Sequence, residues 1–249
     1  MKNLFVMASL CGILFTSCKF DSMTMLGNKR IEPSNDIVNK EFAFDNFDRV
    51  ELDVVAGVQF VQTADKNCRA VLTAPDNYLD LYQLEVSDGK LNVELSRGHI
   101  DIVTDKTSIT IFAPMLHELI SSGVANVKIN KLNSKRLKVE NSGVGTMTLN
   151  DIRVGELMAE CKGVGNIELS GQSYRTEMTC SGVGHIKAEN LKANIVVGEV
   201  SGVGGISCYA VDSIIASVSG VGSLKYEGSP QHKKIVRTGI GKITGAKNE

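Results

Sequence analysis

Apolar and polar residues alternate in short stretches along most of this chain. From residue 124 to residue 243, aliphatic side chains recur at every second position over a few residues at a time. A period of two is typical of strands with one buried face. The nearest approach to a helix is one or two turns near residues 78–84. The pattern therefore predicts an all-β protein.

A glycine motif interrupts this alternation at regular intervals. The motif reads small polar residue, Gly, Val, Gly, variable residue, aliphatic residue, and seven near-identical copies occur with spacings of 18 to 20 residues. The first copy has Ala125 in place of the second Gly, the third begins with Lys162, and the seventh has Ile240 in place of Val. Its first glycines, here called the corner glycines, are Gly123, Gly143, Gly163, Gly182, Gly202, Gly220 and Gly239. So regular a period indicates one structural unit stacked on itself. Positions below are counted from the corner glycine as zero.

The apolar positions change parity across each motif. They fall at even positions before the corner glycine, then at +1, and then at +4 and +6. A strand cannot change parity without a corner, and glycines permit the backbone angles that a corner needs. We expect the Val at +1 to point inward and fill the corner. A longer return loop would contain residues such as Asn133, Ser134, Gln172 and Asn194.

Stacking such units pairs each strand with its equivalent in the next repeat. The prediction is a parallel β-helix, or β-solenoid, of about 20 residues per coil with two main sheets. Residues 42–115 are β-rich but irregular: Ala56-Gly57-Val58 looks like a degenerate corner, and Leu84 to Val93 reads as a hairpin with an Asp-Gly turn. We expect this part to continue the coils and close one end.

The first residues predict export. A basic start at Lys2 precedes an apolar run from Leu4 to Phe15, which is too short to span a membrane and reads as a signal peptide. The following Thr-Ser-Cys resembles a bacterial lipobox, which makes Cys18 the lipidation site; the alternative is ordinary cleavage that leaves a free thiol. The expected organisation is a signal peptide at 1–17, a tether at 18–41 and one solenoid domain at 42–245, with the seven repeats in 116–245. The chain is expected in the cell envelope, lipid-anchored to the outer membrane.

The amino-acid composition restricts the classes of partner that we expect this protein to bind. With 27 Lys and Arg against 28 Asp and Glu, the net charge is −1 and no basic region suggests a nucleic-acid ligand. The absence of Trp argues against strong stacking on sugars. The expected partners are the membrane, through the N-terminal lipid, and an unidentified protein or glycan; a homo-oligomer stays open.

Few residues suggest reactive chemistry. Without a Cys-x-x-Cys pair and with four His in the chain, a structural zinc site is not expected. Cys161 and Cys180 share position −2 of adjacent repeats, close enough for a disulfide, although buried free thiols are favoured. Glu140 and Glu160 share position −3, where a solvated strand face is favoured over a cation site. His185, on a corner, is not expected to be a catalytic base. No catalytic residue, metal or cofactor is predicted.

The lipobox, the β-rich lead-in and the seven motifs together resemble the putative auto-transporter adhesin, head-GIN domain family. The resemblance covers about residues 42–245. It implies a right-handed β-helix in which the motif is the tight turn between sheets, a role in cell adhesion, and no catalytic residues. The expected function is a non-enzymatic envelope lipoprotein that serves as an adhesion or interaction scaffold. The alternatives are a lyase-like polysaccharide-processing enzyme with a degenerate site and a self-stacking structural subunit.

Overall fold

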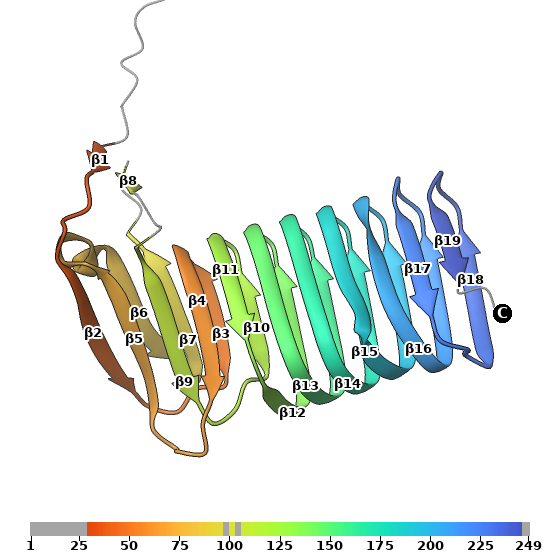
Figure 1. Cartoon of the computed structure of the whole chain (residues 1–249), viewed down its shortest axis with the longest axis horizontal. Helices are drawn as coiled ribbons and strands as arrows, with labels where there is room; N and C mark the ends of the chain where they lie inside the picture. Colours follow the sequence, from red (N-terminus) through yellow and green to blue (C-terminus); the bar gives the residue numbers. More distant parts are fainter. Residues whose placement is uncertain (1–28, 97–99, 103–105, 246–249) are drawn as a thin grey trace, which may run out of the picture.

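The computed structural model describes residues 29–96, 100–102 and 106–245. They form a solenoid of about six turns with roughly 20 residues per turn, which confirms the predicted fold class (Figure 1). The predicted signal peptide and Cys18 lie outside the described residues.

The repeats stack as parallel strands in register. Each corner residue lies opposite its equivalent in the next coil, as Val144 does with Val164 and Val164 with Val183. The strands of this part are β10 (Glu118–Ser121), β11 (Val124–Ile129), β12 (Leu132–Asn141), β13 (Val144–Cys161), β14 (Val164–Cys180), β15 (Val183–Val200), β16 (Val203–Val218), β17 (Ser223–Glu227), β18 (His232–Arg237) and β19 (Lys242–Gly245). Equivalent side chains therefore form columns that run along the solenoid axis.

The return side of each coil differs from the prediction. Asn133 and Ser134 lie within β12, Gln172 within β14 and Asn194 within β15, so the predicted return loop is strand. The ladder bends there with register shifts, for example between Leu149 and Ile152. The backbone N–H and C=O groups of one bend face those of the bend in the next coil, as they do in flat strands. They therefore form the same hydrogen bonds between coils. The two flat faces thus belong to one continuous ladder.

The irregular N-terminal part continues the coil. β3 (Arg49–Asp53) pairs in parallel with β10 and β7 (Lys90–Leu95), while β4 (Val55–Gln62) pairs in parallel with β11 and β9 (Ser108–Ala113). β6 (Tyr82–Ser87) and β7 form the predicted hairpin, with Asp88 and Gly89 at φ values of 50° and 71° in its turn. The expected helical turn is the short 3-10 helix η1 (Asp76–Leu81).

The fold begins earlier than predicted. β1 (Lys29–Ile31) pairs with β8 (Ile100–Ile102), and β2 (Ile37–Phe44) pairs antiparallel with β5 (Cys68–Pro75), so the predicted tether is wrong for these residues. Phe42 and Phe44 of β2, inside the predicted domain, pack partly buried against the core. β5 also pairs antiparallel with β9, and this arrangement closes the N-terminal end.

The degenerate corner lies three residues before the predicted place, at Val54. Val55 is paired with Val124 and Gly57 with Asn126, so Gly57 occupies position +3 and not the corner itself.

The core is a stack of aliphatic layers. Positions +4 and +6 are buried from the first repeat through the fifth, as are even positions before the corners. Position +4 contributes Val127, Met147, Ile167, Ile186, Ile206 and Leu224. Thr176 interrupts this packing: it is fully buried between Leu157 and Val196 in its column, and its hydroxyl has no hydrogen-bond partner among the described residues.

Candidate functional site

The side chains at position +1 of the seven motifs point outward, which corrects the prediction that they fill the corners. All of them are at least about half exposed, from 48% at Val144 to 87% at Ile240. The set, here called the corner row, comprises Val124, Val144, Val164, Val183, Val203, Val221 and Ile240. These side chains are therefore part of the molecular surface.

The glycines are required by the close approach of neighbouring coils. A Cβ on Gly163 would overlap the carbonyl oxygen of Gly143 in the preceding coil. Gly165 meets the same obstacle against Gly145 and also has a φ of 153°, which L side chains rarely adopt. The motif thus provides tight backbone stacking, a requirement that parity alone does not reveal.

The side chain at position −2 fills each corner instead. This column is buried from the first to the sixth repeat: Ser121, Asn141, Cys161, Cys180, Val200 and Val218. Asn141 Nδ2 donates a hydrogen bond of 2.9 Å to the carbonyl oxygen of Gly145. The thiols of Cys161 and Cys180 make the equivalent contacts to Gly165 and Gly184, at 3.4 and 3.3 Å. The inside of the corner is therefore a structural layer closed to ligands.

The cysteines of the described part are buried free thiols. Cys161 and Cys180 lie opposite each other on β13 and β14. The hydrogen bond to Cys180, together with burial, raises the pKa of the Cys161 thiol. Burial and the nearby carboxylates of Glu189 and Glu227 raise the pKa of Cys208 to about 12. Neither thiol is activated as a nucleophile, since the thiolate is the reactive form.

The carboxylates at position −3 are tied into a row of ion pairs. Lys162 Nζ lies 3.0 Å from Glu140 and 2.8 Å from Glu160, and Lys138 Nζ lies 3.3 Å from Glu140 and 3.2 Å from Glu118. The Glu140 side chain is only 13% exposed, so the expected solvated face is here partly buried. Burial opposes ionisation, but hydrogen bonds that include those from Lys162 and Lys138 hold the pKa of Glu140 below its usual value.

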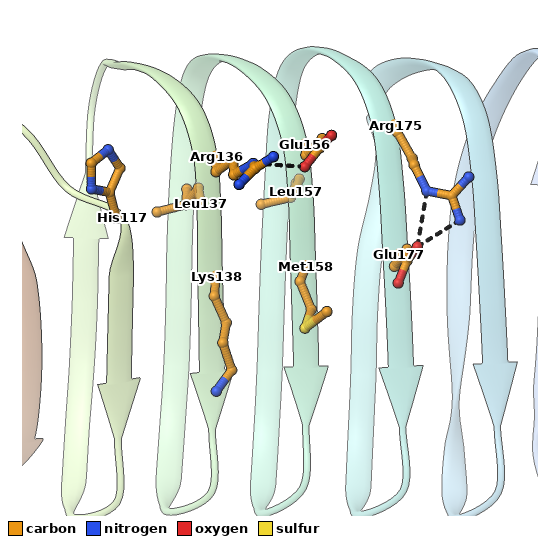
Figure 2. Close-up of a pocket in the computed structure, with 9 residues that line it drawn as sticks. All are labelled: His117, Arg136, Leu137, Lys138, Glu156, Leu157, Met158, Arg175 and Glu177. Atoms are coloured by element: carbon orange, nitrogen blue, oxygen red, sulfur yellow. Dashed lines mark hydrogen bonds and ion pairs between the residues drawn. The ribbon is translucent and has the colours of Figure 1, made fainter.

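A groove of about 370 Å³ crosses the outer face of β12, β13 and β14. Its polar lining comes from His117, Arg136, Lys138, Glu156, Arg175 and Glu177. Figure 2 shows Arg136 reaching Glu156 on the next coil, while Arg175 folds onto Glu177 of its own strand; these pairs measure 2.9 and 2.6 Å. The exposed thioether of Met158 lies between them, so the surface is mixed in character.

The sequence analysis did not predict the groove residues, although their positions in the repeat contain a signal. Arg136, Glu156 and Arg175 share position −7 of successive repeats, and the structure places them in one column. Tabulating the outward positions repeat by repeat would have revealed this alternation of charge. Arginine at such a site can bind carboxylates with two parallel hydrogen bonds.

His117 is the histidine that lines the groove. Its Nδ1 lies 2.9 Å from Asp48 Oδ2 at the edge of the groove. His185 is exposed on a corner, where its backbone N–H donates to Asn166 Oδ1 at 3.1 Å. Among the described residues, no group of three His, Cys, Asp or Glu could hold a metal ion, and no helix is long and apolar enough to cross a membrane.

This geometry defines a parallel β-solenoid protein with glycine-stacked corners. A family model matches residues 46–230, and the chain belongs to the family described as putative auto-transporter adhesin, head GIN domain. The resemblance recognised from the motifs is thereby confirmed.

Solved structures extend the comparison. A putative adhesin from Bacteroides fragilis shares 32% sequence identity at a TM-score of 0.84, over 87% of this chain and 100% of that one. A putative lipid binding protein from Parabacteroides distasonis has 22% identity and a TM-score of 0.69, over 88% of this chain and 100% of that one, and shares the fold. No curated protein matches the chain.

Proposed function

We propose that this protein is a non-enzymatic envelope lipoprotein, anchored to the outer membrane through Cys18, whose solenoid is an adhesion or interaction scaffold. The main observation that supports this proposal is the groove on β12, β13 and β14. It crosses three successive coils, so a ligand that fills it extends along the solenoid axis. The adhesin description of the family and of the Bacteroides fragilis relative supports the same role.

The charges of the groove favour an acidic ligand. Arg136, Lys138 and Arg175 contribute three cations to the lining, against the carboxylates of Glu156 and Glu177. Surface ion pairs of this kind contribute little to stability, so exchanging one for a ligand carboxylate costs little. The ligand class that fits is an extended acidic polymer, either a uronate-bearing glycan or an acidic protein segment.

Binding of the purified full chain to glycan and acidic-peptide arrays tests this role. We expect the double variant Arg136→Ala with Arg175→Ala to bind at least roughly a hundredfold more weakly, because each of the two lost charge-assisted hydrogen bonds contributes about 1.5–3 kcal/mol. The matched control is Arg153→Ala with Lys192→Ala, which removes two cations from a separate hollow. Equal weakening by both double variants contradicts the groove as the contact site.

The enzyme alternative is tested on the same material. A lyase needs a free base beside its substrate, whereas Glu140 and Glu160 are held by Lys162. Incubation with uronate polymers is therefore expected to leave chain length unchanged. Clear bond cleavage would replace the scaffold proposal with the enzyme.

Anchoring and location are tested in cells. The Cys18→Ala variant is expected to leave the membrane fraction, and a variant that stays there contradicts the lipid anchor. Protease treatment of intact cells then distinguishes a surface-facing adhesin, which is digested, from a periplasmic scaffold, which is protected.

A further inference from the structure

The corner row forms an exposed aliphatic stripe along one edge of the molecule. Its first five members, from Val124 to Val203, are paired in register from coil to coil. Seven corners, separated by six intervals of roughly 4.8 Å, give the stripe a length of about 29 Å. A regular apolar stripe of this length on a soluble surface marks a contact with something apolar.

The edge that carries this row is free of carboxylates. Positions −1 to +3 of the seven corners contain no Asp or Glu, although the chain has 28 of them. The ionisable side chains of these positions are Lys162, His185 and Lys242, all able to carry positive charge. The remaining positions −1 are Ser or Thr. Such an edge repels neither apolar chains nor anionic headgroups.

The corner backbone is already satisfied. The N–H groups of Ser142 and Gly143 both donate to the carbonyl oxygen of Ser121, at 2.9 and 3.0 Å, and Val144 N–H donates to Gly123 at 2.9 Å. The same pattern recurs at Lys162, Gly163 and Val164. At these corners, contact with a water-poor surface therefore leaves the N–H groups of positions −1, 0 and +1 paired, where unpaired groups would be costly.

The described chain begins beside this edge. Figure 1 shows β1 above the same edge of the solenoid as the turns between β16 and β17 and between β18 and β19. Ten residues lie between Cys18 and Lys29, and the eleven steps from one to the other reach at most about 40 Å. A lipid on Cys18 would keep the corner edge near the bilayer. Figure 2 shows the groove residues Arg136, Glu156 and Arg175 near the bends of their strands, away from the arrowheads that lead into the corners.

We propose that the corner edge lies against the lipid surface of the membrane that holds the anchor, with the corner row in contact with the bilayer. The inference rests on the anchor of the proposed function. In this orientation the solenoid lies along the membrane, and the groove stands away from it, accessible to ligands.

The test is a depth measurement on the full-length lipidated chain in vesicles of phosphatidylethanolamine and phosphatidylglycerol. An environment-sensitive fluorophore is attached at Val164→Cys, in the corner row, or at Ile215→Cys, an exposed aliphatic position of the flat face. The buried native thiols stay unlabelled. We expect a nitroxide-bearing lipid to quench the label at position 164 at least threefold more than the label at position 215.

Each other outcome overturns the inference. Equal quenching at both positions, or none at either, shows that the edge does not face lipid, and the row then serves only coil stacking. A label at position 164 that is shielded from aqueous iodide but not quenched by lipid shows that a protein covers the row. Failure of the chain to float with the vesicles instead contradicts the anchor, and with it both the proposed attachment and this orientation.

Discussion

The side-chain amide of Asn141 donates a 2.9 Å hydrogen bond to the carbonyl oxygen of Gly145, across the corner that both residues flank. Asn141 is 1% exposed, so no solvent replaces it when it is removed. We expect Asn141→Ala to lower the free energy of unfolding by about 1–3 kcal/mol, because a buried carbonyl loses its donor. Urea unfolding measures the effect.

The control for that variant is Cys161→Val. It removes only a weak thiol donor, and Val already occupies position −2 at residues 200 and 218. We expect a loss below about 1 kcal/mol. Equal losses for the two variants would show that the amide hydrogen bond is not what stabilises the corner.

The second glycine of the third motif, Gly165, should tolerate no side chain. Gly165→Ala places a Cβ against the carbonyl oxygen of Gly145 at a φ of 153°, so we expect a loss of roughly 2–4 kcal/mol. Gly57→Ala is the matched change, because the nearest atom to its Cβ would be Thr107 O at 3.9 Å. Thermal unfolding should separate the two variants, and a similar melting temperature for both contradicts the stacking role.

The buried hydroxyl of Thr176 gives a prediction of opposite sign. Because this hydroxyl has no partner among the described residues, Thr176→Val should stabilise the fold by about 1 kcal/mol. Thr148→Val, at a half-buried position, should change stability little. Denaturant midpoints measure both, and destabilisation by Thr176→Val would indicate that the hydroxyl has found a partner.

The ion pairs around Lys162 should make stability depend on pH at both extremes. The pKa of Glu140 is lowered on folding, so its contribution is present above the ordinary value of 4.5 and is lost as pH falls through the folded value. The hydrogen bonds that Lys162 donates to Glu160 and Glu140 raise the pKa of Lys162, so its contribution is present below 10.5 and is lost as pH rises through the folded value.

A single variant isolates this effect. Lys162→Met should cost about 0.5–1 kcal/mol near neutral pH, since the pairs are partly exposed. It should also make the free energy of unfolding fall less steeply at acidic pH than it does in the parent protein. Lys128→Met, an exposed change without a recorded ion pair, serves as the control. An unchanged acid limb contradicts the coupling between Lys162 and its carboxylates.

The C-terminal end offers a prediction about self-association. Lys233 and Arg237 of β18 are paired with Ile214 and Val218, whose side chains lie in the core, so charged residues stand at inward positions of the last coil. Inward charges on an edge strand oppose pairing with another chain. The double variant Lys233→Val with Arg237→Val should therefore associate end to end, as light scattering at several concentrations would detect. A variant that stays the size of the parent contradicts this role; Lys135→Val with Lys192→Val controls for lost charge.

The repeat made the architecture predictable, because seven corner glycines with nearly constant spacing admit few folds other than a stack of coils. The hairpin around Asp88 and Gly89 was equally accessible, since its turn chemistry is local. The outward orientation of the Val144 side chain could not be predicted in this way. A residue between two glycines does not belong to the alternation of inward and outward side chains along a strand. The distance between adjacent backbones depends on how the coils stack, which a single repeat does not reveal.

The groove was missed for a different reason. Arg136 and Arg175 are separated by 39 residues, and neither belongs to a motif. Their proximity depends on the register of three coils, which follows from the repeat only when outward positions are compared one by one. Strands β1 and β2 were missed because their pairing partners, β8 and β5, lie far along the chain.

The bulges on the return side have an evolutionary consequence. Repeats of 18, 19 and 20 residues keep identical corners because the surplus residues are accommodated at shifts such as those between Glu168 and Ser170 or Ala188 and Lys192. One edge of the molecule is thus held constant while the other accepts insertions and deletions. Members of this family could therefore acquire new recognition loops on the return edge, or gain and lose whole coils, without redesign of the edge that stacks them.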